Sequence, residues 1–137
     1  MANKTCVKDT IKYYAGAAAA IGASPIPGSD AVLLSGLQMK MTRDILAAYS
    51  ISVGLGMLVE EVIKAKVVSM LGKALAGNLI KLIPFAGSVV GGAINATVAS
   101  GITYTMGRAL VKAAEIIVEN GWSDDKEMVV STIRRTI

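Results

Sequence analysis

The chain has 137 residues, enough for a single domain with one core, and it carries a net charge of +4. Hydrophobic residues make up 53% of it and charged residues only 18%, whereas soluble domains carry about 25% charge, so the surplus apolar surface is expected to meet lipid or partner subunits. The absence of histidine and the single cysteine exclude an imidazole base and an internal disulfide, and the basic residues are not interleaved with aromatic residues as in nucleic-acid binding proteins.

Residues 5–23 are predicted to form the first helix, because Val7, Ile11 and Tyr14 are spaced for one helical face. A basic stripe recurs every four residues along this helix and comprises Lys4, Lys8 and Lys12. A solvated face is the simpler interpretation of the stripe, and contact with lipid headgroups is the alternative. Since a proline-containing turn and a further helix follow, we expect this segment to belong to the mature protein rather than to a signal peptide.

A turn containing Pro25, Pro27 and Gly28 is predicted to end the first helix, because proline fixes φ and lacks a backbone donor. Ser29 or Asp30 then caps a second helix over about residues 30–49. The expected apolar stripe of this amphipathic helix is Leu33, Leu37, Met41, Ile45 and Ala48. The polar residues expected to lie off the stripe are Ser35, Gln38 and Thr42, and Gln38 is expected to hydrogen-bond between helices, as is Asn95.

The third helix is predicted over residues 53–81, where several glycines could divide it into two pieces. Glu60 and Lys64 form an i,i+4 pair in the favourable order. A short amphipathic helix is predicted to close the chain over residues 123–136. Its acidic residues lie at the amino-terminal end and its arginines at the carboxyl-terminal end, the order that the helix dipole favours.

The fourth helix is predicted to begin at Pro84 and to run to about residue 119. Residues 82–107 carry no charge, and this length exceeds the roughly 20 residues that a bilayer-spanning helix needs. Small residues recur on one side of this helix and bulky aliphatic residues on the other, which is typical of close helix packing. The predicted packing residues are Gly87, Ser88, Gly91, Gly92, Ala96, Ser100 and Gly107.

These elements predict an all-α fold, a compact helical module of four to six helices in a single domain over residues 1–137. The sequence at residues 25–29 is echoed at residues 84–88. The echo is consistent with two pseudo-repeated helical hairpins, although two independent helix-start turns would look alike.

Two motifs resemble those of the bacterial YcjF-like family of unknown function, and together they span about residues 24–112. The first runs from Ile26 through Pro27, Gly28, Ser29 and Asp30 to Leu37, Gln38, Met41, Ile45 and Tyr49. The second is Ile83 to Ser88 followed by Thr103, Tyr104, Gly107, Arg108 and Ala109. The resemblance implies a helical, membrane-associated module that is often fused to a small GTPase domain or encoded beside one. Ser50 stands where the family commonly has glycine.

No residue pattern supports catalysis, so the chain is expected to be neither an enzyme nor a binder of cofactors or metals. It lacks a phosphate-binding loop, since Gly72-Lys73 is followed by alanine and has no upstream glycine at the required spacing. The adjacent acidic pairs Glu60-Glu61 and Asp124-Asp125 diverge on a helix and form no dyad.

The leading functional hypothesis is a membrane-associated helical module that acts as partner or effector of another protein, with a small GTPase in trans as a candidate. We expect lipid contact, homo-oligomerisation and no nucleic acid. The expected location is a bacterial inner membrane or its cytoplasmic side, with the cytoplasm as the alternative. A soluble self-assembling scaffold is the second hypothesis and a membrane-permeabilising protein the third.

Overall fold

The computed structural model describes residues 4–22, 30–51, 57–75 and 96–137. In these ranges the chain forms helices and no strand, which confirms the all-α prediction. The helices are α1 (Lys4–Gly22), α2 (Asp30–Ala48), α3 (Met57–Leu75), α4 (Ala96–Glu119) and α5 (Lys126–Thr136). The first, second and fifth predicted helices agree with these bounds to within a few residues. Residues 53–56 and 76–81 of the predicted third helix and residues 84–95 of the predicted fourth lie outside the described ranges.

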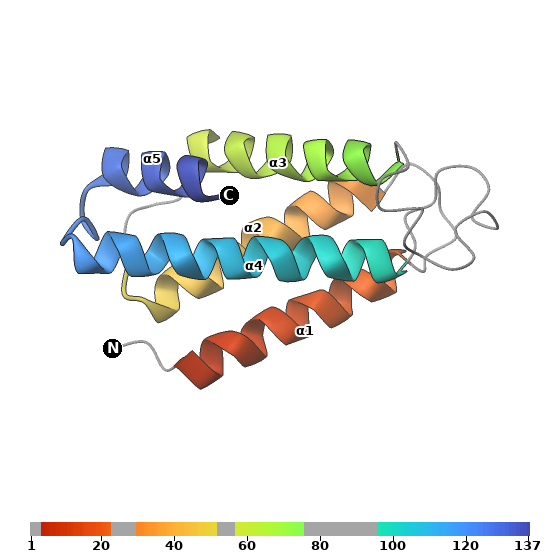
Figure 1. Cartoon of the computed structure of the whole chain (residues 1–137), viewed down its shortest axis with the longest axis horizontal. Helices are drawn as coiled ribbons and strands as arrows, with labels where there is room; N and C mark the ends of the chain where they lie inside the picture. Colours follow the sequence, from red (N-terminus) through yellow and green to blue (C-terminus); the bar gives the residue numbers. More distant parts are fainter. Residues whose placement is uncertain (1–3, 23–29, 52–56, 76–95) are drawn as a thin grey trace.

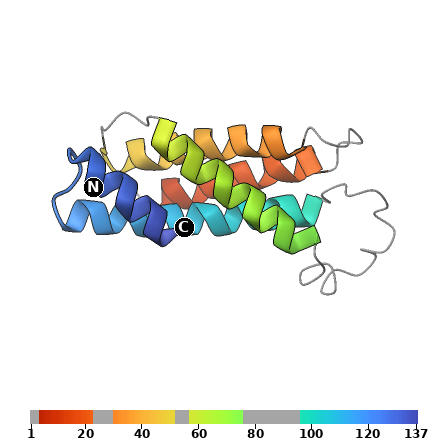
Figure 2. The same ribbon diagram turned by 90° about the horizontal axis from the view of Figure 1, so that it is seen from above.

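Consecutive helices run in opposite directions along one common axis and form an elongated bundle (Figure 1). In this view α2 and α4 form the middle of the bundle, with α1 on one side and α3 and α5 on the other. Figure 2 shows that α3 and α5 both run obliquely to α1, α2 and α4. The most extensive contacts in the bundle join α1 to α4, and α3 contacts α2, α4 and α5.

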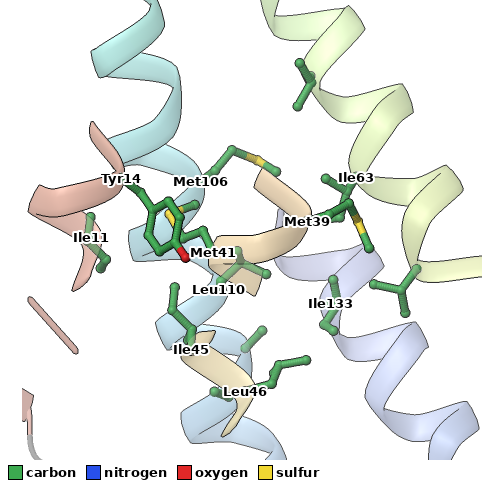
Figure 3. Close-up of a cluster of buried hydrophobic side chains, with 14 of the residues drawn as sticks. Ile11, Tyr14, Met39, Met41, Ile45, Leu46, Ile63, Met106, Leu110 and Ile133 are labelled. Carbon is green, nitrogen blue, oxygen red and sulfur yellow. The ribbon is translucent and has the colours of Figure 1, made fainter. Parts of the chain in front are cut away.

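The core is built from aliphatic side chains and methionines that all five helices contribute. Figure 3 shows its central part, where Ile11 and Tyr14 of α1 meet Met106 and Leu110 of α4. Ile133 of α5 is completely buried in the same cluster. The low aromatic content of the chain therefore gives a core of flexible and branched aliphatic side chains rather than of large rings.

The predicted apolar stripe of α2 is wrong in part. Leu33 is 50% exposed and Ala48 is exposed, whereas the supposedly peripheral Gln38 and Thr42 are fully buried. The physical reason is that α2 contacts α1, α3 and α4, so its buried surface is wider than one stripe.

Two buried polar side chains of α2, those of Gln38 and Thr42, make hydrogen bonds close by. The Gln38 side chain donates from Nε2 to Thr103 Oγ1 on α4 at 2.7 Å, which confirms the expected inter-helix bond. Thr42 Oγ1 donates to the Gln38 carbonyl at 2.7 Å, and Thr103 Oγ1 donates to the Ala99 carbonyl at 2.9 Å. Asn95 lies outside the described residues.

Local electrostatics support the helices as the sequence predicts. Lys64 Nζ and Glu60 Oε1 are 2.7 Å apart, which confirms the i,i+4 pair.

Before α5, Gly121 adopts φ +70°, and the Asp125 side chain then caps the helix by accepting a hydrogen bond from the Met128 amide at 3.1 Å. The arginines of α5 lie in its last turn, where they complement the helix dipole.

Candidate functional site

A groove of about 1000 Å³ runs between α1 and α4, and basic side chains line it on both helices. Four cationic side chains line it, two from each helix, and all four are exposed: Lys8, Lys12, Arg108 and Lys112. The other lining residues are Val7, Ile11, Tyr49, Tyr104, Ala109, Val111, Glu115 and Thr136. We call this feature the basic groove.

The helical repeat places the cations in line on each wall. Lys8 and Lys12 are four residues apart on α1, and Arg108 and Lys112 are four apart on α4, so each pair lies on one face of its helix. Tyr104 precedes Arg108 by another four residues, is 46% exposed and continues the same row. The floor beneath these side chains is apolar, because Val7 and Ile11 are buried against α4.

Gly107 allows the two walls to approach each other closely. A Cβ placed on Gly107 would lie 2.8 Å from Ile11 Cγ1 and 2.9 Å from Ile11 Cγ2, well inside van der Waals contact. Only glycine therefore leaves room for Ile11 in this arrangement. The result is that the basic stripe of α1 lies beside the basic row of α4.

At one end of the basic groove, the acidic residue Glu115 contacts Tyr49, which directly follows α2. Tyr49 donates a hydrogen bond from its hydroxyl to Glu115 Oε1 at 3.4 Å. Burial, together with the nearby Glu115 carboxylate, raises the pKa of Tyr49. Among the described residues that line the groove, Glu115 is the one acidic residue, against four cations.

The opposite flank of α1 carries a different charge pattern. A groove of about 590 Å³ separates α1 from α2 and is lined by two carboxylates, Asp9 and Asp44, and by Lys40. Tyr14 donates a hydrogen bond to the Asp44 carboxylate, and burial together with that carboxylate raises the pKa of Tyr14. Cys6 also lines this flank and is exposed. The charge of α1 is thus divided between two sides, with Lys8 and Lys12 towards α4 and its one acidic residue, Asp9, towards α2.

The residues singled out from the sequence fall at different places relative to the basic groove. Lys8 and Lys12 line it, and Gly107 is buried against Ile11, one of the lining residues. Ala96 begins α4, Ser100 is half-buried in it, and Lys4 and Asp30 begin α1 and α2. The residues outside the described ranges are Pro25, Pro27, Gly28, Pro84, Gly87, Ser88, Gly91 and Gly92.

The sequence interpretation missed the part that Arg108 and Lys112 play. The structure places both beside the α1 lysines, a neighbourhood that the sequence alone does not indicate. The spacing of Tyr104, Arg108 and Lys112 at intervals of four was the available signal. This spacing indicates that the three residues share one helical face, but it does not indicate which helix packs beside that face.

No transmembrane helix is found where the structure can be described. Within these ranges no helix combines the length and hydropathy needed to cross a bilayer. Of the uncharged stretch, residues 96–107 form the first half of α4, and residues 82–95 lie outside the ranges. The same described residues contain no group of three or more His, Cys, Asp or Glu side chains that could hold a metal ion.

Comparisons with models of protein families, with curated proteins and with solved structures found no match for this chain. The resemblance to the YcjF-like family therefore stays a prediction from its motifs. The site has to be interpreted from its own geometry and charge.

Proposed function

We propose that this chain is a membrane-associated helical module that binds an anionic lipid surface through the basic groove. The observation that carries the proposal is the convergence of four cations from two helices on one groove, with a single carboxylate among the described residues that line it. The exposed Tyr104 supports it, since tyrosine favours the interface between headgroups and hydrocarbon. The acidic flank of α1 sets the orientation, because Asp9 and Asp44 would be turned away from an anionic surface.

The size of the electrostatic effect fits reversible surface binding. A lysine or arginine close to an anionic bilayer contributes about 1 kcal/mol, so four contribute about 4 kcal/mol, or roughly a thousandfold in partitioning. Mobile ions screen this attraction over a Debye length of about 8 Å at physiological ionic strength. Such an attachment is peripheral and depends on salt, and a second attachment would be needed for permanent anchoring.

The proposed role on the membrane is that of a partner or effector of another protein, with a small GTPase as the candidate class. This part of the proposal is supported by the motif resemblance described above. The self-assembling scaffold is the competing function, and lipid dependence distinguishes the two.

The test is co-sedimentation of the purified chain with phosphatidylcholine vesicles, with and without phosphatidylglycerol. We expect binding only when the anionic lipid is present, and release as salt is raised. The variant Lys8→Gln/Lys112→Gln should bind more weakly by about 2 kcal/mol, or roughly thirtyfold. The matched control Lys40→Gln/Lys126→Gln removes the same charge from exposed positions outside the basic groove and should bind nearly as well as the unchanged chain. Equal binding to both kinds of vesicle, or equal losses in both variants, would rule out the proposal.

A further inference from the structure

The register of α1 against α4 fixes the order of the cations along the basic groove. The two helices run antiparallel (Figure 1), and Ile11 lies against Gly107. Starting from this contact, each step to a higher residue number along α1 corresponds to a step to a lower residue number along α4. The axial order is therefore Lys112, Lys8, Arg108 and Lys12, alternating between the two walls.

This order produces a closely spaced row of positive charge. Successive cations differ in height by two residues, or about 3 Å at 1.5 Å per residue, and the four span about 9 Å. Four like charges within such a length repel one another, and one singly charged headgroup balances only one of them. A ligand that carries two phosphates a few ångströms apart balances the row far better. Arg108 adds a planar guanidinium, which binds phosphate oxygens through two parallel hydrogen bonds.

We infer that the basic groove is a specific site for a bisphosphate group, in which two phosphates lie along the alternating row of lysines and Arg108. The inference deepens the proposed function, on which it rests for the assignment of the groove to a lipid headgroup. The volume of about 1000 Å³ accommodates such a group, since ligand sites commonly measure about 300–1000 Å³. Its apolar floor suits the carbon skeleton that joins the two phosphates.

The experiment compares two anionic lipids at equal total charge and adds a soluble arm. Vesicles containing cardiolipin, which has two phosphates on one lipid, are compared with vesicles containing twice as much phosphatidylglycerol. Binding of pyrophosphate to the chain is measured by calorimetry. We expect at least tenfold tighter binding to cardiolipin vesicles than to phosphatidylglycerol vesicles, and this preference should disappear in Lys12→Gln/Arg108→Gln.

The matched control is Lys126→Gln/Arg135→Gln, which removes one lysine and one arginine from exposed positions on α5. This control should keep the cardiolipin preference, whereas each groove substitution should weaken binding about fivefold. Circular dichroism checks that each variant is folded. Since all four positions are exposed, unfolding is not expected.

The outcomes separate the inference from the proposed function. Equal binding to the two anionic vesicles, or a preference that survives in Lys12→Gln/Arg108→Gln, overturns the bisphosphate site while membrane association stands. Calorimetric binding of pyrophosphate without binding to either vesicle supports the site with a free bisphosphate as its ligand, and overturns the membrane assignment. Failure to bind both vesicles and pyrophosphate overturns both.

Discussion

The contact between Gly107 and Ile11 can be tested by adding a single methyl group. Alanine favours a helix interior over glycine by about 1 kcal/mol, so Gly→Ala stabilises an open helical site. At Gly107 the new Cβ would lie 2.8 Å and 2.9 Å from the two γ carbons of Ile11 and 3.3 Å from Cδ1. Isoleucine has one strongly preferred rotamer in a helix, so its branched side chain cannot turn away, and α1 must shift from α4.

Overpacking of this kind costs about 1–3 kcal/mol, which exceeds the gain in helix propensity. We therefore expect Gly107→Ala to destabilise the chain by up to about 2 kcal/mol in urea unfolding followed by circular dichroism. The matched control is Gly101→Ala on the same helix, where the described residues place no atom within 4 Å of the added Cβ apart from its chain neighbours and the local helix backbone. This substitution should stabilise the chain by about 1 kcal/mol.

Substitutions at Ile11 complete the test. Ile11→Ala removes both γ carbons, so in that background Gly107→Ala should become stabilising. Ile11→Val keeps both γ carbons, so the penalty of Gly107→Ala should persist in it. If Gly107→Ala behaved like Gly101→Ala in the unchanged chain, or if the two Ile11 backgrounds gave the same result, the proposed close approach of α1 and α4 would be wrong.

Substitutions at three further positions probe the polar contacts of the bundle. Gln38→Met should change the free energy of unfolding by no more than about 1 kcal/mol, because Gln38 Oε1 accepts no hydrogen bond within the described residues and Thr103 keeps its hydrogen bond to the Ala99 carbonyl. Gln38→Ala should lower the free energy of unfolding by about 2–4 kcal/mol, because it leaves a cavity. Equal losses in the two variants would contradict this expectation. Tyr14→Phe should cost about 1–2 kcal/mol at neutral pH. Because burial and Asp44 raise the pKa of Tyr14, its contribution is present below its ordinary pKa of about 10 and is lost as pH rises further, so alkaline unfolding curves of the unchanged chain and of Tyr14→Phe should converge. Asp125→Ala should cost about 1 kcal/mol in thermal unfolding and Asp125→Asn much less, since asparagine also caps helices; equal losses would point to charge rather than capping.

Features that depend on neighbours in the sequence could be predicted from the sequence. The bounds of α1 and α2, the Glu60–Lys64 pair and the charge order of α5 follow from periodicity, capping and the helix dipole, which act over one or two turns. The all-α class follows for the same reason.

Features that depend on which helices meet were decided by the tertiary structure alone. The buried surface of α2 is wider than its predicted stripe because α2 touches three other helices, and this number is not encoded in its own period. The basic groove likewise requires Lys8 and Lys12 to lie beside Arg108 and Lys112, from the other end of the chain. Periodicity places each pair on a face, but the antiparallel packing of Ile11 onto Gly107 turns two separate stripes into one site.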